Sequence, residues 1–360
     1  MRLVVFGLSV TSARDNAHAT FWRGVLRALA ADGHEVVFFE RDTPFFAGHR
    51  DLVAPDGYEV VVYPSWSGVL PRARRAVSRA DVAIVTSGQA DAAAATELVV
   101  AAGHTRIFYD LDAPVTFQRL DRGELVSWLP PGGFGELDLV LSVTGGAALD
   151  RFRRELGARR VAPLFACVDA DAFRPPSPRR EPVYDLSYLA TSALDGLSGV
   201  ESLLFGVAER APERRLLVGG VAYAEDRQLS PNLDVVPRVP PAERPAFYGR
   251  SRLTLDGTAA ATASSGFCPS PRLFEAAACG VPIISDGWHG IESFFAPGDE
   301  ILVAAGADDV LAMLELSPEA LGALARGARE RVLAEHTAVH RARELVELAR
   351  AIPARRASAA

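Results

Sequence analysis

Short apolar runs alternate with stretches of helical periodicity along the first half of the chain. Residues 2–8 predict a buried strand, and apolar positions at helical spacing over 17–31, followed by Gly33, predict the helix after it. Further strands are expected at 35–40, 58–63, 81–86, 106–111, 138–143 and 160–165, and helices at 70–79, 90–102 and 146–156. Such apolar strands, separated by helices, predict a parallel sheet covered on both faces.

The alternation stops at residues 169–185, which are rich in proline and charge, and then restarts. Strands are expected at 186–190, 214–220, 233–238, 252–257, 281–285 and 300–304, before an almost purely helical tail over 317–352. The expected fold class is therefore α/β, with two doubly wound domains. We expect a first domain at 1–172, a hinge linker at 173–183, a second domain at 184–335, and a C-terminal helix with a frayed tail at 336–360. Ligands should collect in a cleft at the carboxyl ends of the two sheets.

Composition and charge exclude several classes of protein. The 360 residues include 38 basic and 45 acidic side chains, and the net charge of −7 argues against a general nucleic-acid binder. All the basic residues are arginine. Without lysine, P-loop enzymes, protein kinases, pyridoxal-phosphate enzymes and Schiff-base aldolases are excluded in their usual forms. An anionic ligand must be held by arginine, helix N-termini or backbone amides.

Three cysteines without a CxxC spacing predict neither a disulfide framework nor a cysteine-based zinc site. The first residues lack the pattern of a secretory signal. No apolar run approaches the roughly 18 residues of a transmembrane segment. A cytoplasmic location is therefore expected.

The stretch 270–295 carries the strongest chemical signal. Ser270 is a hydroxyl N-cap followed by proline, so a helix should begin there. The partial positive charge of that helix end, together with Arg272, would make an anion site suited to a diphosphate. Glu275 lies one turn further on the same side, where its carboxylate could bind two sugar hydroxyls. The alternative is that Ser270 and Glu275 only stabilise the helix end.

The motif LFEAAACGVPIISD, within 270–286, resembles the C-terminal-domain signature of nucleotide-sugar glycosyltransferases with the GT-B fold. The wider sequence is more similar still to the bacterial CgeB-like group, named for a spore-maturation protein. The similar pieces span nearly the whole chain, at 7–42, 108–116, 141–149, 246–255, 270–286 and 331–345. The resemblance implies two Rossmann-like domains facing across a cleft, with the C-terminal helix returning to the first. It also implies a metal-independent, cofactor-free transfer, with retention, of a sugar from a nucleoside-diphosphate sugar to a hydroxyl-bearing acceptor. A natural product and an envelope glycan are both open as the acceptor.

The resemblance also implies which residues bind the donor. Glu275 would bind the nucleotide ribose, and Ser270 and Arg272 would face the diphosphate. The other implied donor residues are Thr191, Ser192, Gly219, Gly220, Tyr248, Leu273 and Phe274. His289 follows the end of a predicted strand, where it could contact the donor sugar or phosphate. The sequence departs from many retaining relatives at Phe267, where they carry a second glutamate that contacts the donor sugar.

The first domain should hold the acceptor. His18 could be a general base beside Asn16, because an unperturbed imidazole titrates near pH 6.5. Asp110 and Asp112 follow one strand and Thr144 follows another, at positions where functional residues gather. The structural alternatives are that Asn16 caps a helix on which His18 only packs, that one of the aspartates is structural, and that the turn at Thr144 serves close packing.

During transfer, negative charge grows on the leaving phosphate, and Arg272 with the helix N-termini would oppose it. An inverting reaction would need His18 or Asp112 as base. The alternatives are a nucleotide-sugar epimerase or hydrolase on the same fold, or a non-catalytic nucleotide-sugar binder. A dinucleotide oxidoreductase is disfavoured because the first turn lacks GxGxxG. The oligomeric state stays open.

Overall fold

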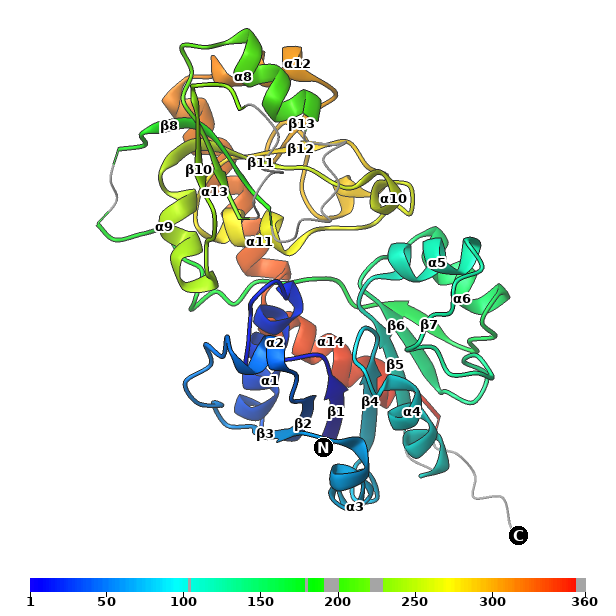
Figure 1. Cartoon of the computed structure of the whole chain (residues 1–360). Coiled ribbons are helices and arrows are strands. Elements are labelled where there is room, and N and C mark those ends of the chain that lie inside the picture. Colours follow the sequence, from blue (N-terminus) through cyan, green and yellow to red (C-terminus); the bar gives the residue numbers. More distant parts are fainter. Residues whose placement is uncertain (103–104, 179–180, 191–200, 221–228, 354–360) are drawn as a thin grey trace. The chain divides into compact units, whose positions relative to one another are not determined.

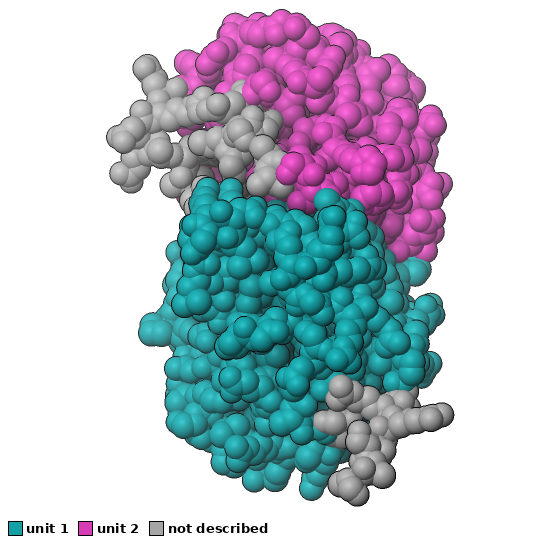
Figure 2. Space-filling view, turned by 90° about the vertical axis from the view of Figure 1, so that its right-hand side faces the viewer, with its two compact units in different colours: residues 1–165, 338–360 teal, residues 166–337 magenta. Residues whose placement is uncertain are grey.

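The computed structural model describes residues 1–102, 105–178, 181–190, 201–220 and 229–353 (Figure 1). It divides into two compact units, residues 1–165 together with 338–360, and residues 166–337 (Figure 2). Each unit contains one parallel sheet covered by helices, which confirms the expected α/β fold class.

Unit 1 contains a seven-stranded sheet in the order β3-β2-β1-β4-β5-β6-β7. Its strands are β1 (Arg2–Gly7), β2 (Glu35–Arg41), β3 (Glu59–Tyr63), β4 (Val82–Thr86), β5 (Thr105–Asp110), β6 (Leu139–Ser142) and β7 (Val161–Pro163). The helices are α1 (Ala17–Ala31), α2 (Pro44–Ala47), α3 (Trp66–Val77), α4 (Ala92–Ala101), α5 (Ala113–Asp121), α6 (Ala147–Arg154) and α14 (Ala338–Arg350).

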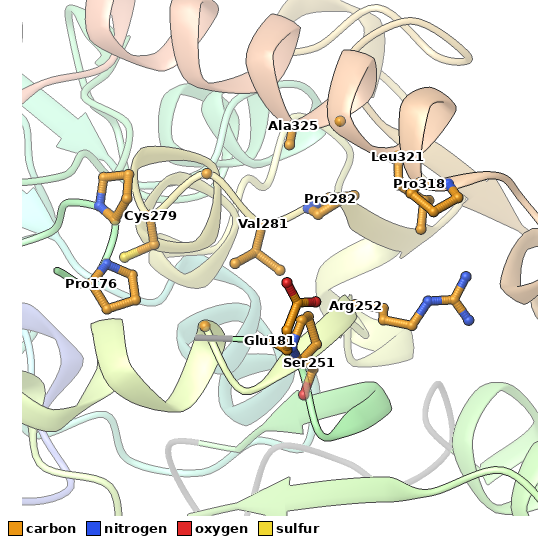
Figure 3. Close-up of a pocket in the computed structure, with 15 residues that line it drawn as sticks. Pro176, Glu181, Ser251, Arg252, Cys279, Val281, Pro282, Pro318, Leu321 and Ala325 are labelled. Carbon is orange, nitrogen blue, oxygen red and sulfur yellow. The ribbon is translucent and has the colours of Figure 1, made fainter. Parts of the chain in front are cut away.

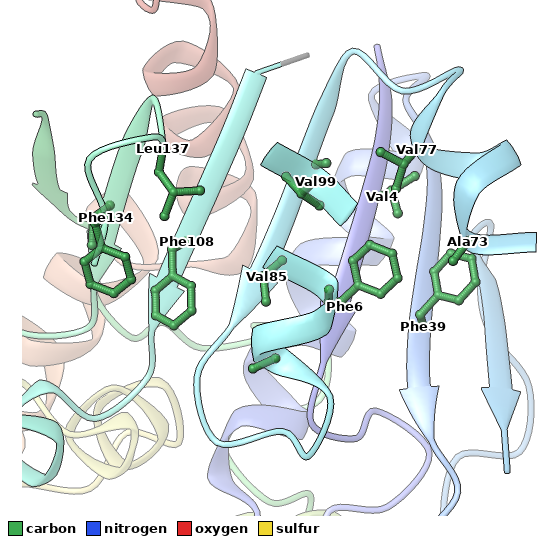
Figure 4. Close-up of a cluster of buried hydrophobic side chains, with 14 of the residues drawn as sticks. Val4, Phe6, Phe39, Ala73, Val77, Val85, Val99, Phe108, Phe134 and Leu137 are labelled. Carbon is green, nitrogen blue, oxygen red and sulfur yellow. The ribbon is translucent and has the colours of Figure 1, made fainter. Parts of the chain in front are cut away.

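Buried side chains from β1, β4 and β5 form the main core of unit 1 with α3, α4, α5 and α6 (Figure 4). Phe6 lies at its centre and stacks on Phe39 with 4.9 Å between ring centroids. Alternate strand residues face the other side, where Trp22 of α1 packs on Phe38 and Tyr109. The sheet is therefore buried on both faces, as its nearly continuous apolar strands require.

Unit 2 contains a six-stranded sheet in the order β10-β9-β8-β11-β12-β13. Its strands are β8 (Tyr184–Leu189), β9 (Leu216–Gly219), β10 (Leu233–Val236), β11 (Ser251–Asp256), β12 (Ile283–Asp286) and β13 (Leu302–Ala304). The α-helices are α8 (Gly206–Arg210), α9 (Arg244–Tyr248), α10 (Ala260–Ala263), α11 (Pro271–Ala278), α12 (Ala307–Leu314) and α13 (Pro318–Glu335). A π-helical turn, Glu201–Phe205, precedes α8, and 3-10 turns lie at Pro241–Glu243 and Ile291–Ser293.

The structure divides the helical tail expected over 317–352 close to residue 336, where the C-terminal helix was expected to begin. The tail is two helices, α13 and α14, separated at His336 and Thr337. The carbonyl of His336 accepts a hydrogen bond from the amide of Val168 at 3.0 Å, and this pairing interrupts the helix. α13 belongs to unit 2, whereas α14 belongs to unit 1 and packs on α1. The return of the C-terminal helix to the first domain is therefore confirmed.

Candidate functional site

Both sheets have a point where the strand order reverses, and ligands of doubly wound folds bind at the carboxyl ends of the strands there. In unit 2 this point lies between β8 and β11. The last residue of β11 is Asp256, and the last residue of the neighbouring β12 is Asp286.

Ser270 and Arg272 both bind the carboxylate of Asp256. The hydroxyl of Ser270 donates to Oδ1 at 2.8 Å and lies 2.9 Å from Oδ2, and Nε of Arg272 donates to Oδ1 at 3.0 Å. Ser270 also caps α11, because its oxygen accepts from the amide of Leu273 at 3.4 Å. The helix start predicted at Ser270 is therefore confirmed, and Arg272 already faces an anion.

Glu275 is buried and does not take part in capping. Its Oε1 accepts from Nη1 of Arg244 at 2.7 Å, and its Oε2 accepts from the hydroxyl of Tyr248 at 3.2 Å. Burial and the neighbouring Glu275 carboxylate raise the pKa of Tyr248 well above its usual value, so its hydroxyl remains a donor. A carboxylate offers about four acceptor positions, and Arg244 and Tyr248 each use one of those of Glu275, whose side chain is only 2% exposed.

Apart from His289, the remaining donor residues fall into three groups. β9 ends at Gly219, and the backbone approaches the end of β8 closely at the next residue, since a Cβ at Gly220 would lie 2.0 Å from the carbonyl oxygen of Ala190. Leu273 and Phe274 point their fully buried side chains into the interior of unit 2. Thr191 and Ser192 lie outside the described residues.

His289 is exposed and lies beside Phe267. The carbonyl of His289 accepts from the amide of Phe267 at 2.7 Å, and the two rings meet edge to face at 5.1 Å. Phe267 has a φ of 44°, a left-handed conformation that is strained for an aromatic residue. Its ring lies over Gly290, where a Cβ would come within 2.6 Å of it. An aromatic surface therefore stands where many retaining relatives carry a carboxylate.

In unit 1 the loop after β1 is held by Glu40, the penultimate residue of β2. Glu40 is fully buried and accepts hydrogen bonds from the hydroxyls of Ser9 and Thr11 and from the amides of Val10 and Thr11. This loop leads to Asn16 and His18 at the start of α1. Burial lowers the pKa of His18 to about 4, so its imidazole is neutral at pH 7 and is a weaker base than an unperturbed histidine.

The two aspartates after β5 have different environments. Asp110 is fully buried, and its oxygens accept from the amide of Asp112 and the hydroxyl of Thr116, each at 2.8 Å. Burial raises the pKa of Asp110 to about 7. Asp112 is exposed and caps α5 through the amide of Val115. Thr144 is buried and bonded to Ser142.

In unit 1 the strand order reverses between β1 and β4. Three buried side-chain atoms at or beyond the carboxyl ends of these strands lack hydrogen-bond partners among the described residues: Oδ1 of Asn16, Oγ1 of Thr86 and Nε2 of Gln89. Asn16 does not cap α1 through its side chain, because its amide nitrogen donates to the carbonyls of Ser9 and Ser12 instead. Buried polar groups without partners are uncommon in native proteins. Thr86 and Gln89 were missed because uncharged residues after a strand give a weak sequence signal.

Asp256 and Arg244 were also missed. Asp256 ends an apolar strand as Asp110 does, so the same signal could have identified it. Arg244 sits in a proline-rich segment with no local signal of its pairing with Glu275, which lies 31 residues away.

A separate cavity of about 480 Å³ lies at the opposite edge of the unit 2 sheet (Figure 3). Ser251, the first residue of β11, and Val281 and Pro282, just before β12, contribute to its wall. The rest of the lining is mainly proline, glycine and aliphatic. It lies at the amino ends of the strands, away from Asp256 and the start of α11, so it is not the expected diphosphate site.

No helix among the described residues is long and apolar enough to cross a membrane. No curated protein matches the sequence. Residues 201–347 match the family model described as "Glycosyl transferase-like".

Solved structures resemble the chain over almost its whole length. Sucrose-phosphate synthase from Thermosynechococcus elongatus is 16% identical with a TM-score of 0.67, covering 97% of this chain and 98% of that one. Anabaena HepE, solved with UDP and glucose, is 12% identical with a TM-score of 0.65, covering 98% and 100%. An alpha-glucosyltransferase solved with UDP-glucose and DNA is 12% identical with a TM-score of 0.67, covering 97% and 99%. The chain therefore has the GT-B fold, and its residues 201–347 are similar to the glycosyl transferase-like family.

Proposed function

We propose that the protein is a glycosyltransferase that moves a sugar from a nucleoside-diphosphate sugar to a hydroxyl-bearing acceptor. The observation that carries this proposal is the start of α11, where the Ser270 cap and Arg272 lie at the carboxyl edge of the sheet within the family-matched segment. Solved structures of the same fold hold UDP or UDP-glucose, so a uridine nucleotide is the first donor to test.

In this proposal Arg272 and the amides of α11 bind the diphosphate and stabilise the charge that develops on the leaving phosphate. Glu275 binds the ribose hydroxyls while Arg244 and Tyr248 hold its carboxylate in place. The other proposed donor contacts are Thr191, Ser192, Gly219, Gly220, Tyr248, Leu273, Phe274 and His289.

We assign the acceptor to unit 1, with His18 or Asp112 as the residues that accept or orient its proton. Asn16, Asp110 and Thr144 complete the proposed acceptor set, and the unpartnered Oδ1 of Asn16 can accept a hydrogen bond from an acceptor hydroxyl. Transfer with retention, a natural-product or glycan acceptor and membership of the CgeB-like group rest on the sequence resemblance and remain parts of this proposal. The cytoplasmic location stays a prediction.

We also propose that the reaction needs no metal. The described residues contain no group of three His, Cys, Asp or Glu side chains placed to hold a metal ion. Arg272 and the helix dipole can supply the positive charge that a divalent cation would otherwise bring to the diphosphate. Transfer measured in excess chelator should then equal transfer in its absence, and loss of activity that magnesium restores would contradict this part.

The test begins with UDP, GDP, ADP and dTDP in thermal-shift titrations, because a ligand that binds only the folded state stabilises it. The preferred nucleotide then identifies the sugar donors for turnover assays with and without acceptor hydroxyl compounds. Transfer requires the acceptor, whereas hydrolysis proceeds without it. Binding without any turnover would favour the non-catalytic binder, an outcome that Phe267 in place of the usual glutamate makes worth testing.

A further inference from the structure

We propose that Asp256 is a positioning residue of the donor site, which holds Ser270 and Arg272 in place and lowers the affinity of that site for phosphates. This inference rests on the proposed function, because it assumes that the diphosphate binds at the start of α11. It adds a residue that neither the sequence motif nor the family resemblance assigns.

The contacts of Asp256 are those expected of a bound anion. Its side chain is 3% exposed, and one carboxylate receives both the hydroxyl of Ser270 and Nε of Arg272. The Ser270 hydroxyl donates its proton to Asp256 while its oxygen accepts from the amide of Leu273. Asp256 therefore fixes the N-cap and the guanidinium together, at the position where the strand order reverses.

The charge balance of this edge opposes strong phosphate binding. Asp256 offsets the charge of Arg272, and a second carboxylate, Asp286, follows on the adjacent strand. Burial, with a contribution from Asp256, raises the pKa of Asp286 to about 6. Burial and both of these aspartates raise the pKa of the buried thiol of Cys268. A diphosphate must therefore share Arg272 with Asp256 and tolerate a negative neighbour, which speeds release of the nucleotide product.

A purely structural role for Asp256 predicts a different result. If the carboxylate only satisfied Ser270 and Arg272, its removal would loosen both groups, and binding would weaken or stay the same. If it competes with the phosphates, its neutral replacement must bind them more tightly. The direction of the affinity change therefore separates the two roles.

The experiment compares the unaltered full-length protein with D256N, D256A, R272A and D299N by calorimetric titration with pyrophosphate and with UDP. D256N removes the charge but keeps the shape of the side chain and one acceptor oxygen, whereas D256A removes the whole carboxylate. Either variant, if it folds, therefore tests whether the charge of Asp256 lowers the affinity for phosphates. Exposed Asp299 provides the matched control, because D299N changes the net charge equally and removes no side-chain hydrogen bond described for this residue. Thermal unfolding establishes that each variant is folded.

We expect D256N to bind pyrophosphate about tenfold more tightly and D256A more tightly by a smaller factor, as expected when a nearby like charge is removed. R272A should bind about tenfold more weakly, and D299N should match the unaltered protein. Unchanged or weaker binding by both Asp256 variants would overturn the inference.

The same experiment separates this inference from the proposed function. Binding of pyrophosphate without binding of any nucleotide would count against the proposed donor, and the pyrophosphate affinities of the variants would still test the role of Asp256. Failure of every variant to bind pyrophosphate would overturn the anion site and the inference together. Where transfer is measurable, D256N should lower both KM for the donor and kcat, since tighter binding of the product slows its release.

Discussion

Removal of Glu275 should destabilise unit 2 strongly, before any effect on ligand binding is considered. Arg244 and Glu275 form an ion pair with side chains 7% and 2% exposed, and Nε of Arg244 is buried without a hydrogen-bond partner among the described residues. Glu275→Ala leaves this guanidinium uncompensated, which costs about 3–5 kcal/mol for a buried pair. The hydroxyl of Tyr248 also loses its acceptor. Folded domains are stable by about 5–15 kcal/mol, so the loss would be a large fraction of the total.

The matched control is the double variant R244M/E275M, which removes both charges. Replacing a whole buried pair with apolar residues of similar size is often nearly neutral, so the double variant should recover most of the stability lost by Glu275→Ala. Hydrogen exchange of peptides from β11, α11 and β12 reports opening of unit 2, with peptides from β1 and β4 as an internal reference. A single melting temperature would not show which unit is destabilised, because the two units of the chain can unfold separately.

Two results would refute this reasoning. One is a Glu275→Ala variant within about 1 kcal/mol of the unaltered protein, well below the cost of an uncompensated buried charge. The other is a double variant as unstable as the single one. If the prediction holds, loss of nucleotide binding by Glu275→Ala does not identify a ribose contact, and the double variant becomes the proper test of that role.

Four further predictions follow from single residues. Because the pKa of Asp110 is raised to about 7, folding favours its protonated form. The free energy of unfolding of unit 1 should therefore fall between about pH 4 and pH 7, by up to about 1.4 kcal/mol for each pH unit. Asp110→Asn should remove this pH dependence from urea-unfolding measurements over the same range. If His18 is the base, His18→Gln should slow transfer by about 10²–10⁴-fold without weakening UDP binding in calorimetry, and equal loss of both would contradict that role. Glu40→Gln places the side-chain NH2 group against hydrogen-bond donors of the loop, such as the Ser9 hydroxyl and the Val10 amide, and should lower the stability of that loop by about 1–3 kcal/mol. The effect should be visible as faster hydrogen exchange over residues 9–16. Gly220→Ala should cost about 3 kcal/mol or more, because its φ of 96° and the Ala190 carbonyl leave no room for a Cβ, and a wild-type melting curve would disprove this clash.

The sequence was sufficient for the architecture because the signals that define it are local. Apolar runs gave the strands, and hydroxyl N-caps such as Ser270 gave helix starts. The boundary expected at 335/336 lies at the break between α13 and α14, whereas the hydrogen bond from Val168 at this break is distant in sequence and had no local signal. Helix α3 begins four residues before the predicted start, since Ser65 caps it through the amide of Gly68.

The candidate site was predicted less completely, because its electrostatics depend on pairs from different elements. The motif correctly indicated a helix end at Ser270, and nothing local indicated that Arg272 would face Asp256 from β11. Likewise, the pairing of Glu275 with Arg244 joins two helices. Spacing within one helix predicts which side chains share a face, and only the packed sheet determines which charge lies opposite.

The placement of α14 has a consequence for how the protein is made. Unit 1 combines residues 1–165 with the C-terminal helix, so the ribosome must synthesise all of unit 2 before the segment that packs on α1 exists. A nascent chain that stops near residue 337 has a full unit 2 and an incomplete partner domain, with apolar surface on α1 uncovered. Premature termination close to the C-terminus would therefore yield a product whose defect appears at the beginning of the chain.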